Sequence, residues 1–278
     1  MEHLKYCVFI DVLGYGELVK DPTKTIEQKI QTLNSIYTNL ASSLMIKINE
    51  INAVITDKIF IKSFSDCFYL ESTNLLALLY SCQGIFNDTF GFYSNLPDSE
   101  YTPLIRGGIV KDWTVRFKDL GAIVNNQDET NPVGLGVARA YWISEKTKLS
   151  GMRLIISDEV IKDLTLNKHS RNGYECYIQE YIYLNIPIYL YLEKIEMNEE
   201  NCPINAYELI WTESAMSSCT YDYLIQLNNI RNNFNANSLR HFKKTAEVVL
   251  KGLLLSDCNK KTENLFKKYK NELTQLIQ

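Results

Sequence analysis

The chain has 278 residues, of which 46% are hydrophobic and 22% are charged, with a formal net charge of −4 at pH 7. This length allows one large domain, or one domain with an appendage, and the acidic balance argues against a general nucleic-acid-binding protein, which usually carries a basic surplus. No apolar stretch approaches the 18 residues of a membrane span and the chain opens without a signal-peptide pattern, so we expect a cytoplasmic protein with no membrane and no nucleic-acid partner.

The first 110 residues predict a strand-helix-strand-strand-helix-strand order. The predicted strands are apolar runs rich in β-branched and aromatic residues, and the predicted helices are amphipathic. In chain order these elements cover residues 5–11, 25–48, 53–64, 67–71, 73–92 and 101–110. This order is that of the ferredoxin-like βαββαβ arrangement, in which the two middle strands form an antiparallel hairpin. We therefore predict an α+β palm fold.

The rest of the chain predicts further strands and then helices. In chain order we expect a hairpin or other excursion at 111–131, a helix at 134–148, a short strand at 152–156, a Tyr-rich β-hairpin at 174–193 and helices from about 213 onward. This pattern suggests a palm domain over residues 1–200, which ends in the β-hairpin, and a C-terminal helical extension over residues 201–278.

Two aspartates stand where apolar strands end. Asp11 closes the first predicted strand, and Asp66 lies in the turn between the two strands of the predicted hairpin. Half-burying a carboxylate without a partner is costly, and neither residue has a cationic neighbour in the sequence. Two such carboxylates on adjacent strands would repel each other unless a cation lay between them, and hard divalent ions prefer oxygen ligands. The pair therefore indicates a Mg²⁺ or Mn²⁺ site, and the alternative is that each aspartate merely caps a turn.

Five short segments, in the right order and on the right elements, resemble the class III nucleotide cyclases. Residues 9–15 (FIDVLGY) resemble the first metal motif of that family and residues 64–66 (FSD) resemble the second. Three further matching segments are the strand at 103–110, the helix at 134–141 and the strand at 153–157. The Arg-Gly-Gly-Ile and Ala-Tyr elements within them are most similar to one branch, the Pycsar pyrimidine cyclases of bacterial anti-phage defence.

The resemblance implies a two-metal enzyme. Asp11 and Asp66 would bridge two divalent ions, either Mn²⁺ or Mg²⁺, and the backbone carbonyl of Val12 would ligate one of them. The ribose 3′-hydroxyl of a nucleoside triphosphate would attack the α-phosphorus and release pyrophosphate. For the Pycsar branch the favoured reaction is UTP to 3′,5′-cyclic UMP. The resemblance also implies a homodimer in which each site takes metal residues from one protomer and base-reading residues from the other.

The predicted third helix departs from the family at the positions that steady the transition state. Most purine cyclases carry an Asn and an Arg there, and the aligned residues in this chain are Ala138 and Trp142. Arg139 is the candidate catalytic substitute, although one residue along a helix is a rotation of about 100°. The alternative is that Arg139 belongs to a surface or interface ion pair.

Two residues occupy the base-reading positions of the family. Lys62 lies four residues before Asp66, and Asn131 lies three residues before Gly134. Lysine only donates hydrogen bonds, so it suits a carbonyl of uracil or cytosine or a ring nitrogen of a purine, whereas asparagine donates or accepts. These two substrate-binding candidates therefore leave the base open between uridylate, cytidylate and purine cyclases. The alternative for Lys62 is a solubilising charge on an edge strand.

A second hypothesis also remains open. The replacement of the family's Asn and Arg is compatible with a catalytically dead, nucleotide-binding regulatory module, whereas the retention of both aspartates favours an enzyme. For a dimer, the excursion at 111–131 and the Tyr-rich hairpin at 174–193 are the candidate contact surfaces.

Overall fold

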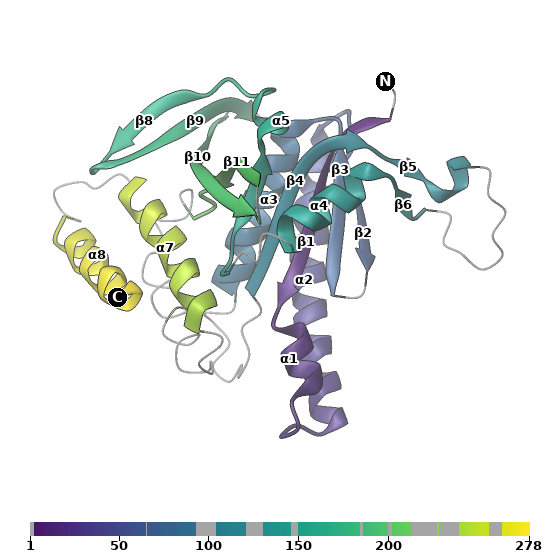
Figure 1. The fold of residues 1–278 in the computed structure, drawn as a ribbon, viewed down its shortest axis with the longest axis horizontal. Helices are drawn as coiled ribbons and strands as arrows, with labels where there is room; N and C mark the ends of the chain where they lie inside the picture. The colour runs from purple at the N-terminus through teal and green to yellow at the C-terminus, as the bar shows by residue number, and fades with distance from the viewer. Residues whose placement is uncertain are drawn as a thin grey trace.

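A computed structural model of the protein describes residues 3–64, 66–92, 104–120, 130–145, 150–183, 186–199, 202–212, 227, 239–255 and 263–278. Within these ranges, one large mixed sheet is covered by helices on both faces (Figure 1). Its strands are β1 (Leu4–Leu13), β2 (Phe60–Phe64), β3 (Cys67–Ser72), β4 (Leu104–Trp113), β7 (Leu154–Ser157), β8 (Asn167–Arg171), β9 (Tyr174–Tyr183), β10 (Ile186–Glu199) and β11 (Cys202–Leu209). The helices are α1 (Tyr15–Lys20), α2 (Ile26–Val54), α3 (Leu75–Phe92), α4 (Leu135–Glu145), α5 (Asp158–Ile161), α7 (Leu239–Leu255) and α8 (Glu263–Ile277).

The strand order confirms the predicted palm. The large sheet runs β2-β3-β1-β4-β7-β11-β10-β9-β8, and its first four strands are antiparallel neighbours in the ferredoxin-like order. β7 lies parallel to β4, and the remaining pairs are antiparallel. The predicted Tyr-rich hairpin is β9 paired with β10. The short strand β5 (Val115–Arg116), within the excursion predicted at 111–131, pairs with β6 (Pro132–Val133), which directly follows that range, and residues 121–129 lie outside the described part.

The two faces of β1 belong to two different cores, because successive side chains of a strand point to opposite sides. Val8 and Ile10 join the larger core, to which α2 and α3 contribute, while Cys7 and Phe9 join a smaller core beneath α4. Figure 1 shows α4 in front of the sheet and α3 behind it. The end of β1 that leads into α1 is therefore flanked by helices of both layers.

Gly108 lets α4 approach β4 closely. A Cβ at this position would lie 2.8 Å from the carbonyl oxygen of Ala140 and would collide with the side chain of Ile143. At the neighbouring Gly107, a Cβ would lie 2.9 Å from both Leu154 and the carbonyl oxygen of Phe9. The consecutive glycines of β4 thus reflect close packing on each face of the sheet.

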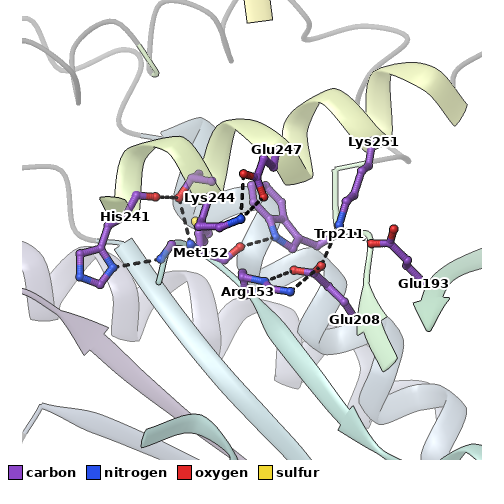
Figure 2. Close-up of polar contacts among 11 residues, drawn as sticks. Met152, Arg153, Glu193, Glu208, Trp211, His241, Lys244, Glu247 and Lys251 are labelled. Carbon is purple, nitrogen blue, oxygen red and sulfur yellow. Dashed lines mark hydrogen bonds and ion pairs between the residues drawn. The ribbon is translucent and has the colours of Figure 1, made fainter. Parts of the chain in front are cut away.

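α7 is joined to the sheet by polar contacts around the start of β7 (Figure 2). His241 Nδ1 accepts a hydrogen bond from the backbone amide of Gly151, and Thr245 Oγ1 accepts one from that of Met152, both at 2.9 Å. Beside them, the fully buried Glu208 of β11 pairs with Arg153 and with Lys251 of α7. α7 is therefore part of the same packed body as the sheet.

Three sequence expectations need correction. The strand predicted at 53–64 begins only at Phe60, because the helical spacing of apolar residues continues through the buried Ile51 and keeps α2 helical to Val54. The predicted domain boundary after residue 200 falls between two strands of one sheet, since β11 is an inner strand. The polar edge strand β8 was absent from the prediction because Asn167–Arg171 shows no apolar alternation.

The C-terminal helical prediction holds for α7 and α8, while residues 213–226, 228–238 and 256–262 lie outside the described part. Among the helices that the structure describes, none is long and apolar enough to cross a membrane.

Candidate metal centre

The fold brings Asp11 and Asp66 to the same end of neighbouring strands. Asp11 of β1 is in register with Cys67 of β3, the residue that directly follows Asp66. The amide of Val12 donates a hydrogen bond of 3.1 Å to the carbonyl oxygen of Asp66. The two carboxylates, which are 55 positions apart in the sequence, are thus attached to adjacent backbone segments.

Asp11 has a cationic partner that the sequence did not reveal. Arg106 of β4 is its cross-strand neighbour, and Nε and Nη2 of Arg106 donate to Asp11 Oδ2 at 3.1 and 3.0 Å. Both side chains are only 12% exposed. Asp11 has no cationic neighbour in the sequence, and the register of β1 with β4 supplies one from 95 residues away. The sequence does contain this arginine, in the Arg-Gly-Gly segment of β4. Only the pairing of β4 with β1 shows that it faces Asp11.

The available donor atoms suit a hard divalent ion. The amide and the carbonyl of one strand residue point to the same side, so the carbonyl of Val12 faces the turn that carries Asp66. Two carboxylates and a carbonyl are the oxygen ligands that Mg²⁺ and Mn²⁺ prefer. Among the described residues, no group of three or more His, Cys, Asp and Glu could hold a metal ion. Mg²⁺ is usually bound by one or two carboxylates together with waters and substrate phosphates, so an ion at Asp11 and Asp66 would complete its coordination in that way.

Tyr37 of α2 adds a buried polar atom to this end of the sheet. Its ring meets that of Tyr15 edge-on, with centroids 6.4 Å apart, and it packs against the core cluster that contains Val12. Its hydroxyl is buried and has no hydrogen-bond partner among the described residues. Burial raises the pKa of Tyr37, and the negative charge of Asp66 is the next largest cause, with a smaller contribution from Asp11. The sequence showed Tyr37 only as one of the apolar positions of a helix.

The two predicted base-reading residues lie close to each other. Lys62 of β2 donates a hydrogen bond of 3.2 Å from Nζ to Oγ1 of Thr130, the residue that directly precedes Asn131. The carbonyl oxygen of Asn131 accepts a hydrogen bond of 2.9 Å from the amide of Phe117. The base of the β5–β6 excursion is thus held beside the edge strand β2, four residues from Asp66.

Arg139 lies away from the two aspartates of its own chain. Its guanidinium pairs with Asp112 at 2.6 Å and with Glu159. Asp112 is paired with Lys5 on β1. Lys5 lies six residues before Asp11, which corresponds to roughly 20 Å along the strand. A cavity of about 330 Å³ is lined by Arg139 and Trp142 of α4, by residues at the start of α5 and by Asn205 of β11. Within one chain, Arg139 therefore occupies the ion pair that the sequence left as the alternative.

Comparisons with known proteins agree with this architecture. A bacterial light-regulated adenylyl cyclase superposes with a TM-score of 0.50 and 13% identity, over 83% of this chain and 57% of that protein. The chain has the fold of a nucleotide cyclase. It spans little more than half the length of that cyclase, and at 13% identity the likeness concerns the fold alone.

Two other solved structures were also found. An adenylate cyclase from Trypanosoma brucei covers 76% of this chain and 90% of its own length, with a TM-score of 0.43 and 11% identity. An adenylate/guanylate cyclase/hydrolase from Silicibacter pomeroyi covers 74% of this chain and 95% of its own length, with a TM-score of 0.41 and 15% identity. No family model and no curated protein matches the sequence.

Proposed function

We propose that this protein is a nucleotide cyclase, which converts a nucleoside triphosphate to a 3′,5′-cyclic nucleotide and pyrophosphate. The observation that carries the proposal is the placement of Asp11 and Asp66 on adjacent backbone segments, at one end of a sheet with the cyclase fold. A carboxylate pair at this place has an evident use in holding the divalent ions that accompany a triphosphate.

The chain's own residues would act mainly by positioning. Asp11, Asp66 and the carbonyl of Val12 would hold two Mg²⁺ or Mn²⁺ ions, which, when bound, favour deprotonation of the 3′-hydroxyl and neutralise the triphosphate. The 3′ oxygen then forms a bond to the α-phosphorus as the bond to the β-phosphate oxygen breaks. Arg106 holds the carboxylate of Asp11 in one orientation and adds a positive charge close to where the phosphates would bind.

The substrate that we favour is UTP. The main support is the resemblance of the β4 and α4 segments to the Pycsar cyclases, and on this proposal the protein would make an anti-phage second messenger in the cytoplasm. The base-reading candidates Lys62 and Asn131 leave the base itself open, and the contact between Lys62 and Thr130, the neighbour of Asn131, supports only that both belong to one site. The ammonium of Lys62 would donate to a uracil carbonyl, for which a lysine is suited.

The location of Arg139 supports a homodimer. Because the guanidinium of Arg139 is paired with Asp112, which faces Lys5 at the other end of β1 from Asp11, it would serve catalysis only in the site of a second copy. Large apolar side chains on α4 and beside the β5–β6 excursion are also exposed, as at a contact surface. They are Trp113, Leu120, Leu135 and Tyr141.

One observation favours a second candidate, a nucleotide-binding regulatory module without catalysis. The two family positions on α4 carry the exposed Ala138 and the half-buried Trp142, and neither side chain supplies a positive charge. Arg139, the nearest cation on the helix, is already paired with Asp112 and Glu159.

The test is to incubate the purified protein with each of the four nucleoside triphosphates and Mn²⁺, and to identify the products by mass. We expect cyclic UMP to form fastest, and no product from Asp11→Ala or Asp66→Ala. ATP cyclised at least as fast as UTP would exclude the pyrimidine assignment. Binding of nucleotide with no cyclic product from any of the four would favour the regulatory module.

A further inference from the structure

The β5–β6 excursion has little backbone pairing of its own. Its ladder consists of Val115 opposite Val133 and Arg116 opposite Pro132, and a proline has no amide hydrogen to donate. A two-stranded ladder is marginal in water without further packing. Asn131, one of the two base-reading candidates, directly precedes β6. Contacts between the excursion and the large sheet are therefore needed to fix the position of Asn131.

Arg116 makes such contacts with two strands of the palm. Its guanidinium lies over the ring of Phe60 on β2, with Cζ 3.5 Å from the ring centroid, and Nη2 donates a hydrogen bond to Glu71 on β3. Phe60 and Glu71 are cross-strand neighbours, so a single side chain holds the excursion against both strands. A planar guanidinium can stack on a ring and donate hydrogen bonds at the same time, which a lysine cannot do. The ion pair is shielded from water, since the Arg116 side chain is 15% exposed and that of Glu71 only 1%.

The clamp lies beside the contacts that place the base-reading candidates. The amide of the residue that follows Arg116 donates a hydrogen bond of 2.9 Å to the carbonyl oxygen of Asn131. On β2, Lys62 lies two positions after Phe60, so the two side chains point to the same face of the sheet. From that face, Nζ of Lys62 donates to Oγ1 of Thr130 at 3.2 Å. The excursion is thus held on one face of β2 both at Arg116 and at the residue next to Asn131.

We propose that Arg116 is a positioning residue for base recognition, which sets where Asn131 stands relative to Lys62 by holding the excursion on Phe60 and Glu71. The inference rests on the proposed function, because it needs a nucleoside triphosphate whose base reaches Asn131 and Lys62. Arg116 acts through these two residues and does not itself contact the base. Loss of the clamp should therefore weaken the choice between bases and spare metal binding at the aspartate pair.

Glu71 provides a matched control. Besides Arg116, Lys5 of β1 donates to its Oε1 at 2.6 Å and the hydroxyl of Tyr69 donates to its Oε2 at 2.8 Å. The carboxylate keeps these two donors in Arg116→Ala, so we expect that variant to fold. Lys5→Met removes a cation from the same carboxylate, but from β1 rather than from the excursion. Arg116→Lys is the conservative variant, because it keeps the charge and loses the planar stack on Phe60.

The test measures the affinity of the full chain for each of the four 3′-deoxynucleoside triphosphates by calorimetry in the presence of Mn²⁺. These analogues lack the attacking hydroxyl, so they bind without being cyclised. We expect Arg116→Ala to weaken binding of the preferred analogue about 10–100-fold, as for loss of a hydrogen bond from a charged donor, and to bring the four affinities closer together. Arg116→Lys should do the same to a smaller extent, and Lys5→Met should bind as the wild type does. In a Lys62→Ala background the effect of Arg116→Ala should shrink, because both changes remove the same recognition.

The outcomes separate this inference from the proposed function. If the wild type discriminates among the analogues but cyclises none of the natural triphosphates, the proposed function is wrong, and the affinities still decide the role of Arg116. Wild-type selectivity in Arg116→Ala would overturn that role whatever the turnover. Equal weakening of all four analogues, or the same loss in Lys5→Met, would show a merely structural effect and would also overturn it. A wild type that binds none of the analogues would exclude both proposals.

Discussion

Asp11 and Arg106 face each other across β1 and β4, and the guanidinium donates two hydrogen bonds to one carboxylate oxygen, Oδ2. The pair is largely shielded from water, since each side chain is only 12% exposed. The carboxylate proposed to hold a metal is therefore already balanced by a positive charge before any ion binds. This relationship changes what removal of either aspartate should do to stability.

Asp11→Ala should destabilise the metal-free protein, whereas Asp66→Ala should not. The first substitution leaves Arg106 without its carboxylate in a poorly hydrated position, and loss of such a charge-assisted bond costs about 1.5–3 kcal/mol. The free energy of unfolding, measured by urea denaturation without divalent ions, checks this. Equal or greater stability of Asp11→Ala would mean that repulsion between the two aspartates outweighs the ion pair. The double variant Asp11→Ala/Arg106→Ala should be more stable than the sum of the two single changes predicts.

Glu208 should make stability depend on pH in the acid range. Burial alone raises the pKa of this carboxyl, but the charges of Lys251 and Arg153 outweigh it, so the pKa lies below its ordinary value. Its contribution is thus fully present above the unfolded-state pKa of about 4.3 and is lost as the pH falls toward the folded-state value. Glu208→Gln should lower the free energy of unfolding by about 3 kcal/mol at pH 7, and the difference from wild type should shrink between pH 5 and pH 3.

Urea denaturation at a series of pH values measures this difference. Glu263→Gln is the control, because Glu263 pairs with Lys267 on the exposed surface of α8 and should leave the pH dependence close to that of the wild type. A difference between Glu208→Gln and wild type that stays constant down to pH 3 would contradict the assignment of this dependence to Glu208.

Gly108→Ala should weaken the seating of α4 on β4. The added methyl group would press on the carbonyl oxygen of Ala140 and on Ile143, and such overpacking typically costs about 1–3 kcal/mol. Thermal denaturation measures the effect. The control is Gly84→Ala in α3, where the atoms nearest to the new Cβ belong to the flexible side chain of Lys47 and where alanine favours a helix. A Gly108→Ala variant as stable as Gly84→Ala would show that the helix shifts without cost.

Two inactive variants should restore each other's activity if the sites are shared between protomers. Asp66→Ala keeps Lys62, and Lys62→Ala keeps Asp66, so a mixed dimer contains one complete site. Random mixing should recover about a quarter of the wild-type rate of pyrophosphate release, since half of the dimers are mixed and each has one of two sites intact. Sedimentation should show dimers throughout. No recovery despite confirmed mixed dimers would exclude the shared site or the base-reading role of Lys62.

The amino-acid sequence alone determined the order of the elements of the palm. Alternation and helical spacing involve residues close together in the chain, so they predicted the βαββαβ palm and put Asp11 and Asp66 at strand ends. The helical spacing of apolar residues also continues to the observed end of α2 at Val54. The prediction ended this helix too early, at residue 48. These features need no knowledge of which strands become neighbours.

Only the tertiary structure decided which side chains meet. Arg106 reaches Asp11 across 95 residues of sequence, and Lys62 reaches Thr130 across 68. Such contacts depend on strand register and on how closely helices pack, which no local pattern specifies. The same is true of Arg139, which the fold places in an ion pair at the far end of β4 from Arg106, and of Tyr37, whose ring the fold brings edge-on to that of Tyr15.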